Sequence, residues 1–143
     1  MTTHLEARRD AAQATLARFD GARFRWSSND CLRLAAFNVR KLGYAPIMPK
    51  AGSYSSARGA LKALRAAGFD SIEAAIDAMG FERIAPAAAL PADLVALPGE
   101  GGWPAITVAM GNGRVLGFME GRCGVMQPNQ YVTAWRVAPC LKP

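Results

Sequence analysis

Histidine is almost missing from this sequence: the 143 residues contain one, His4. Cysteine is also scarce, with three residues at positions 31, 123 and 140 and no pair in C-x-x-C spacing. An odd, sparse set of cysteines excludes a disulfide framework, and the lack of paired Cys or His ligands excludes a structural zinc site. We therefore expect neither a metal nor a cofactor.

Long apolar runs are absent as well. None reaches the roughly 18–20 residues that a membrane span needs, and the polar segment Met1–Glu6 lacks the apolar centre of a signal peptide. The sequence predicts no membrane span and synthesis in a cytoplasm. With 51% hydrophobic and 20% charged residues, the chain is globular. Its length fits one domain, which we place over residues 1–143.

The net charge of +6 is uneven along the chain. Residues 1–65 hold twelve Lys and Arg against four Asp and Glu, or +8, and residues 66–143 hold five against seven, or −2. A basic half indicates an acidic partner, a nucleic acid, or simply a solvated surface rich in Arg. Because no run of Lys and Arg exceeds two residues and aromatics are not interleaved with them, the pattern argues against a nucleic-acid partner.

The hydrophobic period changes in the middle of the chain. Helical spacing predicts helices over 5–19, 31–42, 54–67 and 72–79, and short apolar or alternating runs predict strands over 81–84, 93–97, 105–110, 114–118 and 131–137. Gly111-Asn112-Gly113 indicates a hairpin. Helices followed by antiparallel strands are typical of the α+β class. The expected core contains Leu34, Phe37, Leu61, Leu64, Val95, Val108 and Trp135.

Cys31 is the residue that could carry chemistry. It follows Asp30, a favourable N-cap, and opens a predicted helix. A thiol there lies near free backbone N–H groups and the positive end of the helix dipole, which favour the thiolate. Cysteine peptidases place their nucleophile at such a helix start. The alternative is a small apolar side chain on the buried face of the helix, since free cysteine is among the most buried residue types.

Three segments in order carry a family resemblance. Trp26-x-x-x-Asp30-Cys31-x-x-Leu34 resembles the segment around the nucleophile of NlpC-type peptidases, which are papain-like enzymes that cleave cell-wall peptides. Pro91-Ala92-Asp93-Leu94-Val95 is similar to that family's Pro-Gly-Asp-Leu-Val strand, and 106–113 to its His-Val-Gly-Ile-Tyr-Ile-Gly-Asn-Gly hairpin. The resemblance implies a papain-like fold, with a helical N-terminal half packed on a small antiparallel β-sheet, and puts Cys31 in the nucleophile's place.

A narrower resemblance covers nearly the whole chain. Small NlpC-like proteins encoded by phages near their tail genes show a Trp before Asp-Cys, a Tyr-x-x-x-x-Gly-Ala segment and a terminal Ala-Trp-Arg. The counterparts in this chain are Trp26 with Asp30-Cys31, Tyr54 to Ala60, and Ala134-Trp135-Arg136. This resemblance implies a virion protein of the tail or tail tip, with tail-hub or distal-tail proteins as partners and a contact with peptidoglycan.

The chain departs from the peptidase pattern at the position of the general base. A cysteine nucleophile needs a base with a pKa near the working pH, normally histidine. The hairpin alignment puts Ala105 at the histidine position and apolar residues or glycine, 116–118, near the orienting residue. His4 belongs to another segment. The sequence therefore favours a non-enzymatic structural protein in which Cys31 is a relic. The alternative is an active cell-wall cysteine endopeptidase or amidase that uses Cys31 during phage entry.

Two tryptophans are candidate binding residues. Trp103 follows Gly101-Gly102, so an exposed indole on a mobile loop could anchor a partner, since Trp is enriched among interface hot spots. The alternative is that Trp103 simply packs within the domain. Trp26 could line the former substrate groove, or it could pack beside the Cys31 helix.

A third function class, a basic module that binds nucleic acid, requires strongly salt-dependent binding.

Overall fold

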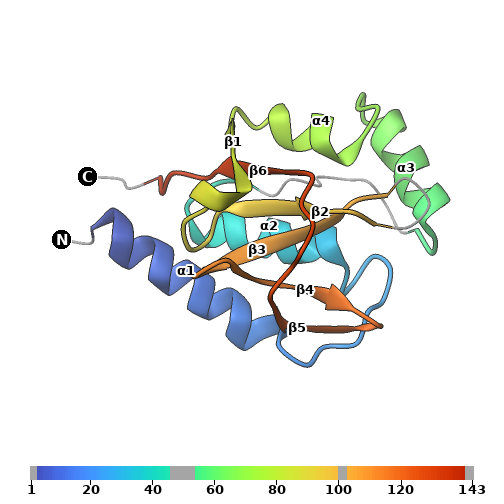
Figure 1. Ribbon diagram of the computed structural model, residues 1–143. Coiled ribbons are helices and arrows are strands. Elements are labelled where there is room, and N and C mark those ends of the chain that lie inside the picture. Colours follow the sequence, from blue (N-terminus) through green and yellow to red (C-terminus); the bar gives the residue numbers. More distant parts are fainter. Residues whose placement is uncertain (1–2, 46–53, 100–102, 141–143) are drawn as a thin grey trace.

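The computed structural model describes residues 3–45, 54–99 and 103–140 (Figure 1). Its helices are α1 (His4–Phe19), α2 (Cys31–Lys41), α3 (Ala57–Ala66) and α4 (Ile72–Asp77), with a 3₁₀ turn over Pro86–Ala88. Its strands are β1 (Glu82–Ile84), β2 (Leu94–Leu97), β3 (Ala105–Gly111), β4 (Arg114–Met119), β5 (Arg122–Met126) and β6 (Thr133–Arg136). The helices precede the strands, so the predicted α+β class is confirmed.

The strands form one antiparallel six-stranded sheet in the order β1-β6-β2-β3-β4-β5. β2 to β5 are consecutive neighbours, and β6 returns to lie between β1 and β2. The predicted hairpin at Gly111-Asn112-Gly113 is confirmed as the β3–β4 turn. Asn112 and Gly113 have φ of 55° and 75°, the pair of positive values that a two-residue hairpin turn requires.

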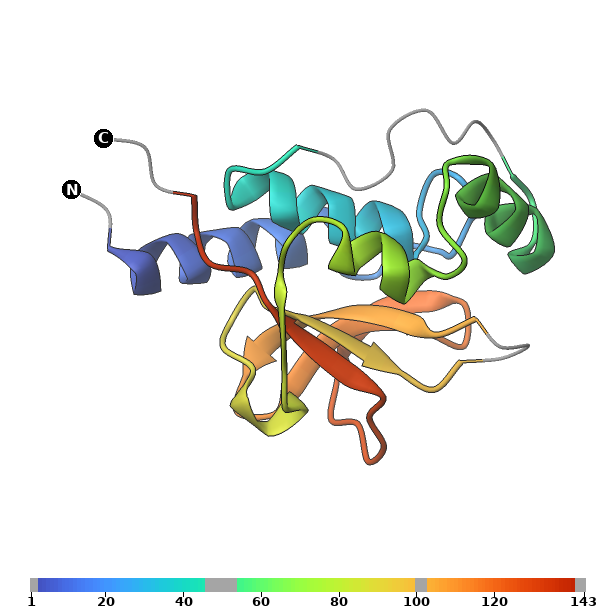
Figure 2. The ribbon, with the colours of Figure 1, turned by 90° about the horizontal axis from the view of Figure 1, so that it is seen from above.

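The helices all cover one face of the sheet, as Figure 2 shows, and the start of α1 lies on the same side of the molecule as the segment that follows β6. The main core lies between these two layers. The predicted core residues Leu34, Leu64, Val95, Val108 and Trp135 are buried, whereas Phe37 and Leu61 are only partly buried. A second, smaller apolar cluster, with Val95 among its members, lies apart from the main core.

β5 has no counterpart among the strands predicted from the sequence. β5 pairs with β4 through a turn at Glu120-Gly121, whose φ values are 51° and 83°. Its sequence, Arg-Cys-Gly-Val-Met, has a glycine at its centre, and glycine weakens a strand signal. The last strand is also shorter than predicted: it covers Thr133–Arg136, and Tyr131 and Val132 are exposed.

Side-chain caps fix where the helices begin. Asp30 caps α2 by accepting a hydrogen bond from the Arg33 backbone N–H at 2.9 Å. Ser56 caps α3 in the same way, accepting from Gly59 at 3.0 Å, so this helix begins at Ala57 and not at the predicted residue 54. The caps satisfy N–H groups that a helix leaves unpaired at its start.

A buried ionic network joins α1 to the sheet. The Asp93 carboxylate, fully buried before β2, accepts a hydrogen bond from Arg8 Nη1 at 2.8 Å and lies 3.0 Å from Arg136 Nε. It also accepts the backbone N–H groups of Leu90 and Val137, at 2.9 and 2.8 Å. Asp93 therefore ties together the first helix, the turn before β2 and the end of β6.

None of the helices that the structure describes is long and apolar enough to cross a membrane.

Candidate functional site

Cys31 is the first residue of α2, and the contacts of Asp30 hold it in place. One Asp30 oxygen caps the helix, and the other accepts hydrogen bonds from the Ser27 N–H at 2.8 Å and the Tyr54 hydroxyl at 3.0 Å. Asp30 is itself buried. All these bonds are structural, because they join the loop before α2 and the segment before α3 to the helix start.

The four candidate residues from the sequence lie around one cavity. Cys31, Ala105, Trp26 and Trp103 all line a space of about 420 Å³. The remaining lining residues are Phe24, Ala57, Pro98, Gly99, Ile106, Phe118 and Gly121. Cys31 and the expected histidine position therefore both contribute to the lining of this cavity.

Aromatic rings form much of the cavity wall. The ring of Trp26 meets those of Phe24, Tyr54 and Trp103 edge to face, with centroids 4.9, 6.0 and 6.4 Å away. Phe24 makes the same kind of contact with Phe118 at 5.5 Å. Edge-to-face pairs of this kind stabilise the fold by more than the burial of their apolar area alone. Trp26 thus packs against the core beside α2 and also lines the cavity.

Trp103 packs over the thiol. It is half-buried rather than exposed, and its indole Nε1 is buried without a nitrogen or oxygen acceptor among the described residues. The glycines at 101 and 102, on which the expectation of a mobile loop rested, lie outside the described residues. At Gly99 an added Cβ would come within 1.9 Å of the Trp103 carbonyl oxygen, so glycine alone permits this approach. The backbone at Gly99 therefore lies close to the backbone of Trp103.

The environment of Cys31 does not activate its thiol. Burial raises the pKa of Cys31, and the nearby charge of Asp30 raises it further. The backbone of Ile106 and the indole N–H of Trp103 lower this pKa, but burial outweighs them. Since the thiolate is the nucleophile, a raised pKa keeps Cys31 in its unreactive form near neutral pH.

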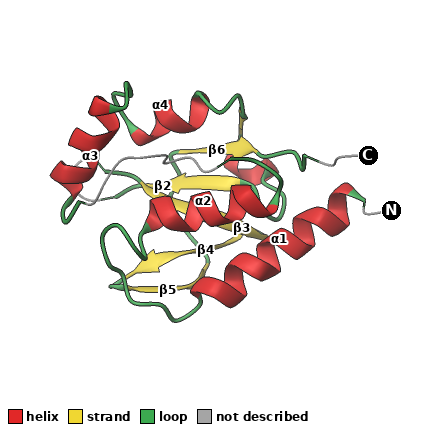
Figure 3. Ribbon diagram, turned by 180° about the vertical axis from the view of Figure 1, so that it is seen from behind, coloured by secondary structure: helices red, strands yellow, loops and turns green. Residues whose placement is uncertain are grey.

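Ala105 occupies the rim of the cavity as the first residue of β3. It pairs with Leu97 of β2 and also packs against the second apolar cluster, whereas its neighbour Ile106 is part of the main core. Cys31 is the sole titratable side chain among the described residues of this lining. His4 opens α1 at the end remote from the start of α2 (Figure 3). The position of the orienting residue falls on β4, where Phe118 lines the cavity.

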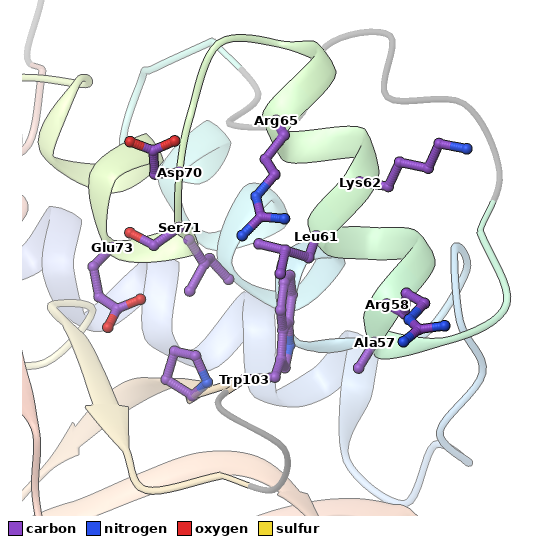
Figure 4. Close-up of a pocket in the computed structure, with 11 residues that line it drawn as sticks. Ala57, Arg58, Leu61, Lys62, Arg65, Asp70, Ser71, Glu73 and Trp103 are labelled. Atoms are coloured by element: carbon purple, nitrogen blue, oxygen red, sulfur yellow. The ribbon is translucent and has the colours of Figure 1, made fainter.

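A second cavity, of about 540 Å³, lies between α3, α4 and the start of β3 and shares Ala57 and Trp103 with the first. Figure 4 shows Arg65 and Leu61 reaching into this space from α3, with Glu73 opposite and the Trp103 ring below. Trp103 therefore forms a wall common to both cavities, a role that no signal in the sequence indicates.

Residues that could hold a metal ion do not come together. Over 3–45, 54–99 and 103–140, no three His, Cys, Asp or Glu residues lie close enough to form a metal site.

The fold and site define an α+β domain with a buried cysteine at a helix start, facing an antiparallel sheet. A family model described as a domain of unknown function, DUF6950, matches residues 3–137. The chain belongs to this family. No significant match was found among curated proteins.

Another thiol makes stability depend on pH. Burial, with a smaller effect of Asp20, raises the pKa of Cys123 from 9.0 to about 11. Between pH 9 and 11 the unfolded chain loses the Cys123 proton while the folded protein keeps it. The free energy of unfolding is therefore unaffected by ionisation of this thiol below pH 9 and falls as the pH rises from 9 towards 11. We expect urea unfolding to show a loss on the order of 1–2 kcal/mol over that interval. Cys123→Ala should flatten this slope, and an unchanged slope would contradict the assignment.

Proposed function

We propose that the protein is a non-enzymatic component of a bacteriophage tail or tail tip, built on a degenerate papain-like, NlpC-type fold. One observation carries the proposal: Cys31 and Ala105 line a single cavity whose described lining offers no second group for proton transfer. Cys31 is the one titratable side chain among the described lining residues, and the side chain of Ala105 packs against the second apolar cluster.

The chemistry of the cavity supports binding over hydrolysis. A thiol nucleophile must give its proton to a base, and the leaving amine must later receive one. Neither alanine nor the aromatic rings of the wall can do this. The indole of Trp103 further occupies space beside the sulfur. An apolar cavity lined by rings suits an apolar side chain from a partner.

The segments that carry the phage resemblance serve the framework of the domain. Tyr54 donates its hydroxyl hydrogen to Asp30, and the Trp135 indole donates to Asp77 Oδ1 at 2.8 Å. These bonds join α2 to the segment before α3, and β6 to the end of α4. Retention of framework residues without the base is what we expect of a scaffold kept for assembly. The tail-hub or distal-tail partners, the virion location and the contact with peptidoglycan follow from the resemblance.

Trp103 is the residue that we expect at the contact with a tail-hub or distal-tail protein. Trp103→Ala should weaken that complex by about 2 kcal/mol or more, the size of an interface hot spot. Isothermal titration calorimetry against the purified hub protein measures this change. Tyr131→Ala, at a site 40% exposed and outside the cavity, is the matched control and should leave the affinity unchanged. Equal affinities for both variants would remove Trp103 from the interface.

The assembly role has a direct test in purified phage particles. Mass spectrometry of virions should detect the chain in a fixed ratio to tail proteins, and the tagged chain should copurify with a tail-hub or distal-tail protein. Its absence from virions, together with copurification only with non-virion proteins, would overturn the proposal.

A further inference from the structure

Two arginines face each other across neighbouring strand segments. Arg23, in the loop after α1, forms an antiparallel bridge with Arg122 at the start of β5. The flanking bonds are Phe24 N–H to Gly121 O at 2.8 Å and Cys123 N–H to Ala22 O at 2.9 Å. They make Arg23 and Arg122 a non-hydrogen-bonded pair, the type in which the side chains lie closest. Like charges placed directly opposite each other in this way are destabilising.

Two more side chains project from the same face. Arg25 lies two residues after Arg23, and alternation along an extended segment puts both on one side. Met119 is the partner of Arg122 in the β4–β5 register, and its side chain is 55% exposed. Between the arginines, Phe24 turns the other way, against Trp26 and Phe118. We call Arg23, Arg25, Arg122 and Met119 the arginine patch.

The positive charges of the patch are not neutralised within the described residues. Arg122 donates only to the Gly21 carbonyl, at 3.3 Å, and none of the three arginines forms an ion pair in the part of the chain that the structure describes. Acidic side chains occur close by in the sequence, at Asp20 and Glu120, and neither bonds to the patch. The fold therefore keeps a repulsive pair that one acidic substitution would relieve.

The surface beside the patch can be approached closely. Gly124, two residues after Arg122, is on the same face, and a Cβ added to it would meet nothing within 4 Å. The loop after α1 and β5 lie side by side at one edge of the molecule (Figure 1). A partner can thus reach both the guanidinium groups and the adjoining sheet.

We propose that the arginine patch docks an acidic surface of a partner protein. The positive charge of the patch is complementary to an anionic partner. Binding of such a partner would also relieve the repulsion between Arg23 and Arg122, which gives a reason for placing the two arginines opposite each other. Arg and Met are enriched at protein interfaces, and the patch contains both and no Lys. Nucleic-acid single strands bind on stacking aromatic rings, whereas Phe24 turns inward. The proposal rests on the docking role proposed above, but not on the cavity at Cys31.

The test uses the whole chain and a capped twelve-residue peptide of Asp and Glu with a central Leu. Arg122→Glu should weaken peptide binding at low salt by about tenfold or more, because it reverses a charge at the centre of the patch. It should also raise the melting temperature, since the new carboxylate would face the Arg23 guanidinium as an opposite charge. Arg58→Glu, at an exposed position on α3, changes the net charge by the same amount and should alter the affinity by less than about threefold.

Several results would contradict the proposal that the arginine patch docks an acidic protein surface. One is equal weakening by Arg122→Glu and Arg58→Glu, which indicates only general attraction to a basic protein. Another is a lower melting temperature for Arg122→Glu. A third is tighter binding to a DNA duplex of equal charge, with the same dependence on Arg122, which assigns the site to nucleic acid. Incorporation of Arg122→Glu protein into virions at the normal level would reject the patch and leave the tail role standing.

Discussion

Asp93→Asn should lower the free energy of unfolding by about 3–5 kcal/mol, the cost of leaving a buried charge without its partner. Asparagine keeps the size of the side chain but removes its charge. Arg8, 4% exposed, would then hold a positive charge inside the protein with no carboxylate beside it. The two backbone N–H groups that Asp93 accepts would also lose a charged acceptor.

Urea unfolding followed by circular dichroism measures this loss. Asp10→Asn is the matched control, because the Arg9–Asp10 pair has side chains 59% and 61% exposed. Exposed pairs contribute between about 0 and 1 kcal/mol, so the control should unfold almost as the unchanged protein does. A loss below about 1 kcal/mol for Asp93→Asn would mean that Asp93 does not hold α1 to the sheet.

Cys140 should react with iodoacetamide before Cys31 does, by about tenfold or more near neutral pH, because buried structural thiols are inert. Cys140 is exposed, and Cys31 is 7% exposed with a raised pKa. Both thiols are in the same molecule, so each sample contains its own reference. A peptidase nucleophile paired with imidazolium would reverse the order.

The rates are measured by mass spectrometry of peptides from protein alkylated at several pH values. Alkylation of Cys31 should accelerate only in the alkaline range, as expected from burial of its thiol. Trp103→Ala removes the ring beside the sulfur and should speed the reaction of Cys31 without changing that of Cys140. Faster alkylation of Cys31 than of Cys140 below about pH 7 would show an activated thiolate and contradict a relic site.

Local signals in the sequence were enough to predict the α+β class and most elements. Gly111-Asn112-Gly113 predicts a hairpin turn because few residues tolerate its positive φ values, and the structure has this turn. Asp30 predicts a helix start since its carboxylate can accept a backbone N–H, as it does. Both effects need only neighbouring residues, and this is why they are visible without tertiary information.

Features that depend on distant residues could not be predicted. β5 has a weak strand pattern and forms because β4 on one side and the loop after α1 on the other supply its partners. Asp93 opens the predicted strand over 93–97, and nothing in the sequence links it to Arg8, 85 positions earlier. The Arg23–Arg122 pair likewise requires knowledge of strand register. The shared cavity of Cys31 and Ala105 was expected only through the family resemblance.

The most direct test of the central claim is the release of peptides from peptidoglycan by the purified protein. The chain and its Cys31→Ser variant are incubated with purified cell walls over a range of pH, and soluble fragments are analysed by mass spectrometry. With Ala105 at the cavity rim and no base beside the thiol among the described lining residues, both proteins should release no more than a sample without protein. Release that depends on Cys31 would contradict a non-enzymatic role and establish the protein as a cell-wall peptidase.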